Sequence, residues 1–294
     1  MMEKTPPVCS YEGSDYQKSF WDEGGRAYED AAEERALRRL LPSNGNMLLE
    51  LGAGAGRNTP RYRGYKQITL VDFSLTQLQQ ASQRLGQSDR YRYVAADIYR
   101  LPFGENQFDA ATMIRTLHHM KDAPLALKKI HACLKPGATF ILEYANKLNL
   151  KAILRYALKR QTWSPYTLEP VEFVELNFDF HPRAIRNWLF DAGYTLERQV
   201  TVSHFRVGFL KRLFPANFLA TLDSWASFTG GWWQLTPSVF TRSIVTAKEN
   251  STTGSFFCCP SCGSALQDTP PELVCQACGK KYPVVDGIYD FRSA

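Results

Sequence analysis

The chain has 294 residues, of which 44% are hydrophobic and 22% are charged, with a formal net charge of +6. This composition is that of an ordinary globular protein, and the charge is too small to indicate nucleic-acid binding by itself. No uninterrupted apolar run reaches the ~18 to 20 residues of a membrane-spanning helix, and the first residues lack the apolar core of a secretory signal. We therefore expect a cytoplasmic protein that makes no use of a membrane, with one large domain and a small one.

The first predicted elements are a helix and a glycine-rich turn. Residues 19–41 have the composition of a helix that covers a core. The apolar run at residues 47–51 predicts a buried strand of a parallel sheet. Gly52, Gly54 and Gly56 follow at a spacing of two, which permits a tight turn and lets a ligand approach the backbone. The polar residues after them, RNT, are expected to open a helix.

The class of cofactor depends on how the glycines are spaced. A second apolar strand ends at Asp72, twenty residues after Gly52, and an acid at that strand tip is placed to accept hydrogen bonds from ribose hydroxyls. The dinucleotide fingerprint G-x-G-x-x-G requires a glycine where this chain has Arg57, and the chain instead reads E-x-G-x-G-x-G from Glu50. A sulfonium nucleoside has no pyrophosphate that a helix N-terminus must hold. The loop therefore favours S-adenosylmethionine over a dinucleotide.

Residues 45–145 resemble the class I S-adenosylmethionine-dependent methyltransferases. Four segments carry the resemblance in the order of that family: LLELGAGAG, LVDFS, AADIYRLPFGENQFDAATMIRTLHHM and HACLKPGATFILEY. The resemblance implies an α/β fold, with a Rossmann-like, seven-stranded sheet and helices on both faces. It also implies a cofactor site in which the glycines line the methionine part, Asp72 takes the ribose hydroxyls and Phe73 lies beside the adenine. The residues expected in that site are Glu50, Gly52, Gly54, Gly56, Asp72, Phe73, Asp97, Ile98 and Arg115.

Two residues of the first predicted helix are further candidates for this site. Arg26 and Tyr28 could reach the carboxylate of the cofactor. A solvated helix face explains them almost as well.

The segment after the fourth predicted strand bears on the atom that receives the methyl group. Amine and amide methylation in this superfamily often uses an Asn/Asp-Pro-Pro-aromatic motif there, whereas this chain has RTLHH at residues 115–119. The departure disfavours exocyclic base nitrogens and glutamine amides and leaves an oxygen or another non-amide nucleophile. His118 or His119 is a candidate general base toward a hydroxyl, and packing under the cofactor is the alternative. A carboxylate would need no base, and LHHM is similar to the methyltransferases that esterify a carboxymethyl group on the wobble uridine of tRNA.

The second half of the large domain is predicted to contain a charged helix and an aromatic insertion. Lys147, Lys151, Arg155 and Lys159 recur every four residues as a cationic ridge, which either faces water or meets phosphates. Residues 179–202 indicate a helix, a glycine stop and the sixth strand, and FTRSIVTAKE indicates the seventh. Between them, residues 205–238 form an insertion rich in aromatic side chains. We expect most of these to roof the core and a minority to line a pocket.

The tail contains two Cys-x-x-Cys knuckles. Cys259, Cys262, Cys275 and Cys278 have the spacing of a closed, structural zinc site, and Cys258 is left over. The sequence CGKKYPVVDGIYDF resembles the short zinc-ribbon activator proteins that bind and stabilise methyltransferases acting on tRNA, rRNA and release factors. That resemblance implies a tail that docks on the methyltransferase sheet of its own chain as an activator in cis, at the high effective concentration that tethering provides. A grip on nucleic acid or protein is the rival interpretation.

The sequence thus predicts a methyltransferase domain over residues 1–249, a linker over 250–256 and a zinc ribbon over 257–294. The expected cofactors are S-adenosylmethionine and a structural Zn²⁺. The expected reaction is methyl transfer to an oxygen or other non-amide nucleophile on tRNA, rRNA or another translation component. A small-molecule methyltransferase with a purely structural ribbon is one alternative, and a non-catalytic cofactor-binding scaffold is another.

Overall fold

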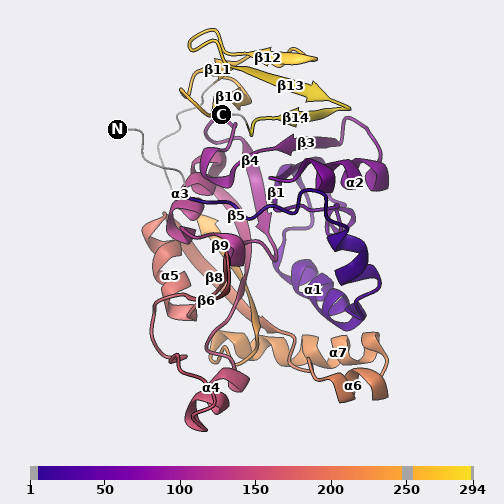
Figure 1. Cartoon of the computed structure of the whole chain (residues 1–294), viewed down its shortest axis with the longest axis vertical. Coiled ribbons are helices and arrows are strands. Elements are labelled where there is room, and N and C mark those ends of the chain that lie inside the picture. Colours follow the sequence, from indigo (N-terminus) through magenta and orange to yellow (C-terminus); the bar gives the residue numbers. More distant parts are fainter. Residues whose placement is uncertain (1–5, 247–253, 293–294) are drawn as a thin grey trace.

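A single large sheet organises the molecule. The computed structural model describes residues 6–246 and 254–292. Its main sheet has ten strands in the order β12-β13-β14-β3-β2-β1-β4-β5-β9-β8 (Figure 1). The seven strands from the large domain are β1 (Gly45–Leu51), β2 (Tyr65–Asp72), β3 (Tyr91–Ala95), β4 (Phe108–Met113), β5 (Leu134–Ala145), β8 (Tyr194–Val202) and β9 (Ser238–Val245). Strand β9 runs antiparallel to both β5 and β8, whereas β1 to β5 are parallel. The predicted α/β fold with a seven-stranded sheet is confirmed.

Helices cover both faces of the sheet, as expected for strands that are apolar on both sides. The first face is covered by α1 (Ala27–Leu40) and α2 (Leu75–Leu85), whose Leu37 and Leu78 are buried against it. The second face is covered by α3 (Ala123–Cys133) and α5 (Pro182–Asp191), which bury Leu127 and Leu189. Among the residues that the structure describes, no helix combines the length and the apolar character needed to cross a bilayer.

Three local expectations of the sequence analysis are wrong. The helix predicted after the glycine loop is only a 3₁₀ turn, η2 (Thr59–Arg61). Only residues 52–64 join β1 to β2, and the loop itself uses the first half of them, so no room remains for a full helix. The cationic ridge does not form, because α4 (Leu150–Ala157) begins after Lys147. The side chain of Lys147 is instead buried and donates to Thr167 Oγ1 at 2.9 Å and to the Glu169 carbonyl at 2.7 Å.

The third error concerns the aromatic insertion. It forms α6 (Gly208–Leu213), α7 (Ala216–Ala226) and the 3₁₀ turn η5 (Ser227–Gly231). Helix α7 buries only Leu219, Ala220 and Asp223, and it packs against α1. The aromatic side chains do not roof the core but face outward, namely Phe209, Phe214, Phe218, Trp225, Phe228, Trp232 and Trp233.

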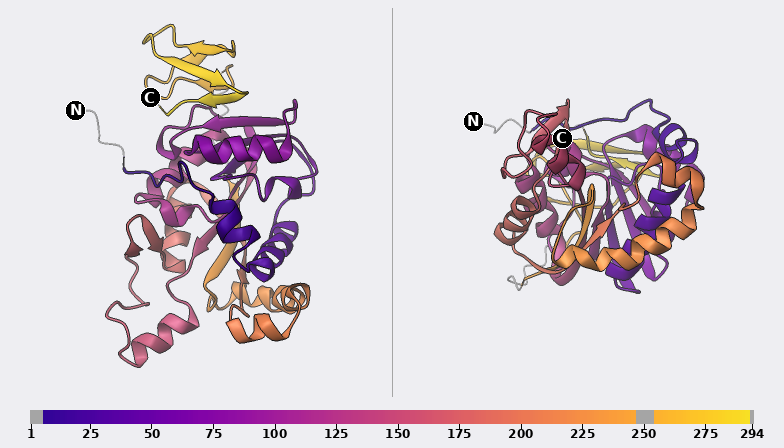
Figure 2. Two further views of the ribbon diagram at one scale, coloured as in Figure 1. Left: turned by 45° about the vertical axis from the view of Figure 1, so that its right-hand side comes forward. Right: turned by 90° about the horizontal axis from the view of Figure 1, so that it is seen from below.

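The ribbon extends the main sheet. Its strands are β10 (Phe257–Cys258), β11 (Ala265–Leu266), β12 (Glu272–Val274), β13 (Lys281–Val285) and β14 (Ile288–Asp290). Strand β14 pairs in parallel with β3, so that the ribbon covers what would otherwise be an exposed sheet edge. Figure 2 shows the ribbon, in yellow, at the end of the molecule opposite α4, α6 and α7. The predicted linker, residues 250–256, lies largely outside the described residues.

Aromatic packing joins the ribbon to the large domain as well. Phe257 is buried and lies 6.0 Å, between ring centroids, from Phe103. Phe256 lies 5.8 Å from Phe108, and the guanidinium of Arg92 lies 4.3 Å from the centre of the Phe256 ring. The backbone of residues 102–104 exchanges hydrogen bonds with that of residues 256–258. The two cores are therefore continuous.

Candidate functional site

A cavity opens where β1 and β2 end. Parallel strands bring their carboxyl ends to one edge of the sheet, which is where α/β proteins bind ligands. Of the residues predicted to hold the cofactor, six line this cavity: Gly52, Gly54, Asp72, Phe73, Ile98 and Arg115. The sequence-predicted residues therefore converge from four separate segments.

The glycine loop is held against Asp72. The Gly54 amide donates to Asp72 Oδ2 at 2.8 Å, and the Ser74 amide donates to Asp72 Oδ1 at 2.9 Å. Burial raises the pKa of Asp72 above its usual value, and these backbone amides oppose that rise. Gly54 has a φ of +53°, and a β-carbon built there meets nothing nearer than Gln77 Oε1 at 3.8 Å. The backbone at Gly54 thus faces space that a ligand can enter. The neighbouring Asp72 carboxylate can accept further hydrogen bonds there.

Three of the predicted cofactor residues do not line the cavity. Glu50 is buried, accepts a hydrogen bond from Thr59 Oγ1 at 2.6 Å, and has its pKa raised to about 7 by burial. At Gly56 a β-carbon would approach Leu85 of α2 to 2.8 Å, so this glycine serves the packing of loop on helix. Asp97 caps the 3₁₀ turn η3 (Ile98–Arg100) by accepting from the Tyr99 amide at 2.9 Å. Glu50 and Gly56 therefore support the glycine loop, and Asp97 supports η3.

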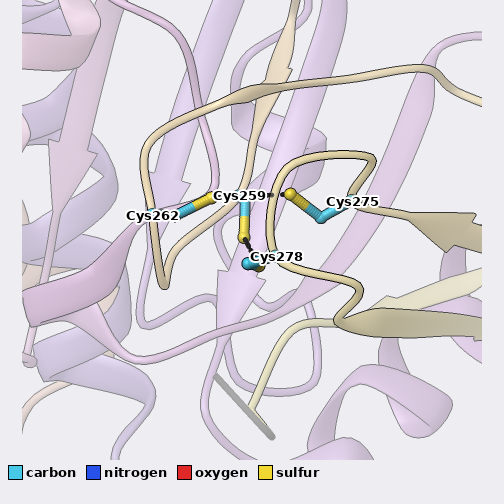
Figure 3. A group of neighbouring side chains, drawn as sticks. All are labelled: Cys259, Cys262, Cys275 and Cys278. Carbon is cyan, nitrogen blue, oxygen red and sulfur yellow. Dashed lines mark hydrogen bonds between the residues drawn. The ribbon is translucent and has the colours of Figure 1, made fainter.

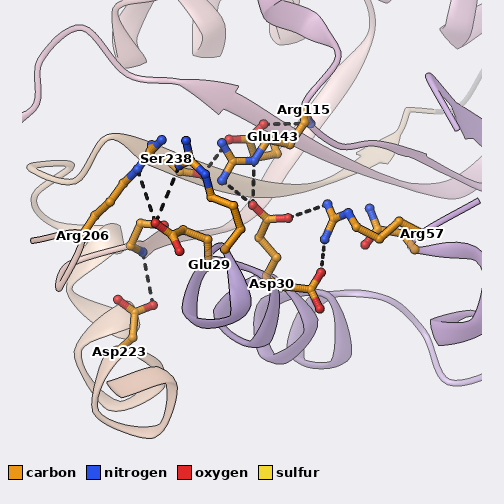
Figure 4. Close-up of polar contacts among 12 residues, drawn as sticks. Glu29, Asp30, Arg57, Arg115, Glu143, Arg206, Asp223 and Ser238 are labelled. Carbon is orange, nitrogen blue, oxygen red and sulfur yellow. Dashed lines mark hydrogen bonds and ion pairs between the residues drawn. The ribbon is translucent and has the colours of Figure 1, made fainter. Parts of the chain in front are cut away.

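Two arginines bring positive charge to the cavity. Arg57 ion-pairs with Asp30, and its Nη2 lies 2.7 Å from Glu33 Oε2. Arg115 Nε donates to Glu33 Oε1 at 2.6 Å, and its backbone amide donates to Glu143 Oε2 at 2.9 Å. Figure 4 shows Arg57 and Arg115 beside the acidic side chains of α1. The buried Glu33 thus orients two guanidinium groups that line one cavity, and both are already paired with carboxylates of α1.

The two α1 residues suggested for the cofactor carboxylate lie elsewhere. Tyr28 is buried against α7, where its hydroxyl donates to Asp223 Oδ1 at 2.9 Å. Arg26 lies 3.7 Å from Glu29 Oε1 and over the Phe20 ring. Neither lines the cavity, whereas Arg57 does.

An N-terminal segment that the sequence analysis left unassigned covers the cavity. Val8, Cys9, Tyr11 and Tyr16 line it, and Val8 forms an antiparallel bridge with Met120. We call residues 8–16 the strap. Glu12 anchors the strap by accepting hydrogen bonds from the amides of residues 75 and 76 at the start of α2. The strap has neither helical nor strand periodicity. Its tyrosines are therefore the one sequence signal that could have indicated a contact with the cavity.

The two candidate histidines differ in position. His119 lines the cavity, and its Nδ1 lies 3.2 Å from the Leu176 carbonyl. A carbonyl only accepts, so Nδ1 carries the proton and Nε2 accepts from the Tyr11 hydroxyl at 3.0 Å. Burial lowers the pKa of His119, which therefore stays neutral near pH 7. His118 lies outside the cavity lining, and burial, followed by the nearby His119 and Arg115, lowers its pKa well below the usual value.

The four tail cysteines form a second site. The sulfur atoms of Cys259, Cys262, Cys275 and Cys278 all lie within 4.8 Å of one another (Figure 3). Cys259 Sγ lies 3.6 Å from Cys278 Sγ, and Cys262 Sγ lies 3.5 Å from Cys275 Sγ. Tetrahedral zinc with bonds of about 2.3 Å separates its sulfurs by about 3.8 Å, so this donor set fits Zn²⁺.

Comparisons with known proteins agree with this geometry. Residues 49–142 match the family model described as a methyltransferase domain. A 2-phytyl-1,4-naphtoquinone methyltransferase of Nostoc punctiforme is 38% identical over 113 residues, which cover 36% of this chain and 49% of the relative. The O-methyltransferase cnsE of Penicillium expansum is 33% identical over 35% of this chain and 40% of its own length. The chain thus spans about half the length, or less, of these curated relatives.

Solved structures show the same fold. A structure of the complex between the Haloferax volcanii Trm112 methyltransferase activator and a methyltransferase matches with a TM-score of 0.55 and 17% identity, covering 83% of this chain and all of that one. An S-adenosylmethionine-dependent methyltransferase structure from Listeria monocytogenes matches with a TM-score of 0.54 and 16% identity over 75% of this chain and 99% of the other. Residues 49–142 therefore match a methyltransferase domain, and the chain has the fold of S-adenosylmethionine-dependent methyltransferases.

Proposed function

We propose that the protein binds S-adenosylmethionine in the cavity above β1 and β2 and transfers its methyl group to an oxygen of a small, apolar organic molecule. The observation that carries the proposal is the pairing of Gly54 with Asp72 at the rim of that cavity. Asp72 would accept hydrogen bonds from the ribose hydroxyls, and Phe73 and Ile98 would flank the adenine. Arg115 or Arg57 would hold the methionine carboxylate.

The bound cofactor supplies an electrophilic methyl group, and the work left to the protein is positioning and the exclusion of water. The strap closes one side of the cavity with Tyr11 and Tyr16. A hydroxyl acceptor must also lose a proton. His119 is the candidate to take it, because its Nε2 lone pair faces Tyr11 at the cavity rather than the solvent. The Tyr11 hydroxyl would have to turn away, or relay the proton, for His119 to act.

A small organic acceptor is favoured over an RNA acceptor by two considerations. Of the curated relatives, one is named as a methyltransferase of a phytyl-naphthoquinone and another as an O-methyltransferase. The segments that follow β5 and β8 leave the sheet at the edge that carries the cavity. They expose many apolar side chains, whereas an RNA-binding surface is expected to be mainly cationic. The likeness to a structure containing a Trm112 activator concerns the fold alone.

Incubation of the zinc-loaded protein with S-adenosylmethionine carrying a labelled methyl group tests this proposal. With a lysate separated into lipid extract, polar small molecules, protein and RNA, we expect the label to accumulate in an organic extract and to resist RNase. A chain carrying Asp72→Ala serves as the inactive control. Label that RNase releases would contradict the small-molecule acceptor, and no incorporation into any fraction would contradict the enzyme itself.

We further propose that the ribbon supports the cofactor site from within the chain. Arg292, at the end of the ribbon, places Nη1 3.2 Å from Glu12 Oε2 of the strap, while its other nitrogens bind Asp290. Glu12 in turn holds the start of α2, the helix that follows Asp72 and Phe73. The contact gives the ribbon a direct connection to the cover of the cavity.

Replacing Arg292 by alanine is expected to weaken S-adenosylmethionine binding about two- to fivefold, because a half-exposed ion pair contributes no more than about 1 kcal/mol. Lys281→Ala is the matched control, since it removes a ribbon ion pair with Glu272 that lies away from the strap. Titration calorimetry with both variants measures the effect. Equal affinity of the two variants would show that the ribbon does not act through the strap.

A further inference from the structure

The exposed apolar side chains of this protein are concentrated at one end. Among the described residues, fourteen of the twenty large hydrophobic side chains that are exposed belong to residues 150–158 and 207–235. We call this set the aromatic rim. Trp232 is 73% exposed, Trp233 is 69% exposed and Phe209 is 70% exposed. Scattered single apolar residues need no explanation, but a grouped set of this size indicates an interaction surface.

The two segments belong to one surface. Figures 1 and 2 place α4, α6 and α7 together at the end of the molecule opposite the ribbon. The Leu150 amide at the start of α4 donates to the Leu235 carbonyl at 2.8 Å, which ties the segment after η5 directly to α4. Along α4 and its end, Leu150, Leu154 and Leu158 recur every four residues and are all exposed. The rim therefore runs from α6 through α7 and η5 to α4.

The rim segments, taken with one to five residues on either side, carry mainly positive charge. Residues 149–163 and 205–236 contain seven lysines and arginines and a single acid, Asp223. That acid is buried and bonded to Tyr28 and His204, so it does not offset the cations at the surface. Lys211 and Arg206 pair with Glu29. Five other cations are exposed and form no ion pair within the described part of the chain, namely Lys151, Arg155, Lys159, Arg160 and Arg212.

We propose that the aromatic rim binds the surface of an anionic lipid bilayer. Elements that lie at the lipid–water interface combine tryptophan, phenylalanine and leucine with lysine and arginine. The apolar side chains enter the acyl region, and the cations stay at the headgroups. The sequence analysis expected no use of a membrane because it found no membrane-spanning segment. Binding to one leaflet of a bilayer does not require a spanning segment.

The rim also has a place relative to the cavity. Both β5 and β8 run antiparallel to β9, so the segments that follow them leave the sheet at the edge where the glycine loop lies. At that edge the Arg115 amide donates to Glu143 Oε2, and Ser238 Oγ donates to Glu143 Oε1 at 2.6 Å, which links the cavity lining to the end of the aromatic insertion. A methyl acceptor dissolved in the bilayer would then meet the cavity edge directly, an extension that rests on the proposed function.

Vesicle co-sedimentation of the full chain tests the proposal without any need for methyl transfer. We expect binding to vesicles of phosphatidylcholine with phosphatidylglycerol, and much weaker binding to phosphatidylcholine alone. The double variant W232A/W233A is expected to lose about tenfold or more of its partition coefficient. The partition coefficient of the double variant K151Q/R155Q should fall about fivefold for each charge removed, and only on anionic vesicles. Added salt should weaken the binding of the parent chain to these vesicles in the same way.

Phe190→Ala is the matched control, since Phe190 is exposed on α5 outside the rim. It should bind vesicles like the parent chain. Affinity for S-adenosylmethionine, measured without vesicles, should be unchanged in all the variants and reports separately on the proposed function. Absence of vesicle binding, or equal binding by W232A/W233A, would overturn the proposal. Concentration-dependent dimers in sedimentation velocity that W232A/W233A abolishes would overturn it in favour of a second copy of the chain.

Discussion

Asp72→Ala is expected to reduce the affinity for S-adenosylmethionine about 100-fold or more. The carboxylate would accept two ribose hydrogen bonds, and hydrogen bonds to a charged group contribute about 1.5 to 3 kcal/mol each. Its loss also frees the Gly54 amide that defines the loop. Asp72→Asn keeps one acceptor oxygen, so we expect a smaller loss of about tenfold. Titration calorimetry with the cofactor measures both.

The chain offers a matched control at the opposite edge of the sheet. Asp109 also accepts two backbone amides, from Asn46 at 2.9 Å and Met47 at 2.8 Å, where β1 begins. Asp109→Ala should lower the melting temperature as much as Asp72→Ala does and leave cofactor affinity nearly unchanged. Similar losses of affinity in both variants would mean that Asp72 acts through stability alone and does not contact the cofactor.

Loss of the metal should have the largest effect on stability. Structural zinc contributes about 10 to 16 kcal/mol to the folding of small zinc domains, so the ribbon is expected to unfold when one ligand is removed. Phe257, Ile288 and Phe291 are buried at its junction with the large domain, and each such side chain contributes about 1.5 to 3 kcal/mol. Cys262→Ser should therefore bind less than one zinc per chain and lower the melting temperature by about 10 °C or more.

Cys258→Ser is the control for this variant, because Cys258 adjoins the cluster but is not among its four sulfurs. It should retain full zinc content and an unchanged melting temperature. Elemental analysis and calorimetric melting of the two variants provide the test. If Cys262→Ser melted like the parent chain, the ribbon would contribute nothing to the large domain, and the proposal of support in cis would fail with it.

The features that the sequence predicts well are those in which a local pattern has a single structural meaning. Glycines after an apolar run, followed by a second run ending in Asp72, specify a strand–turn–strand edge whatever surrounds it. Two Cys-x-x-Cys pairs likewise define a metal site through covalent spacing. The fold class follows from several such patterns in order. The assignment of Gly52, Gly54 and Asp72 to the cofactor stays a prediction, although the structure brings them to one cavity.

Features that depend on distant contacts were missed. No local sequence pattern predicts that the Tyr11 hydroxyl lies 3.0 Å from His119 Nε2, because the two residues are more than one hundred positions apart. The regular spacing of Lys147 with Lys151 suggested one helix, but the buried hydrogen bonds of Lys147 decided otherwise. Aromatic residues in the insertion were expected inside because burial of large apolar surface is favourable. On α7, the exposure of Phe218 and Trp225 reflects the few positions of that helix that α1 can cover.

The parallel pairing of β14 with β3 has a consequence for biosynthesis. Ile288 aligns with Tyr93, so nearly two hundred residues must be made before the edge of β3 finds its neighbour. At about 5 to 20 residues per second, the large domain spends roughly ten seconds or more on the ribosome with that edge unpaired. Nascent chains with open edges are prone to pair with one another. Because the ribbon is part of the same chain, every β3 edge that is synthesised receives its own β14. The covering of the edge therefore never depends on the synthesis of a second polypeptide.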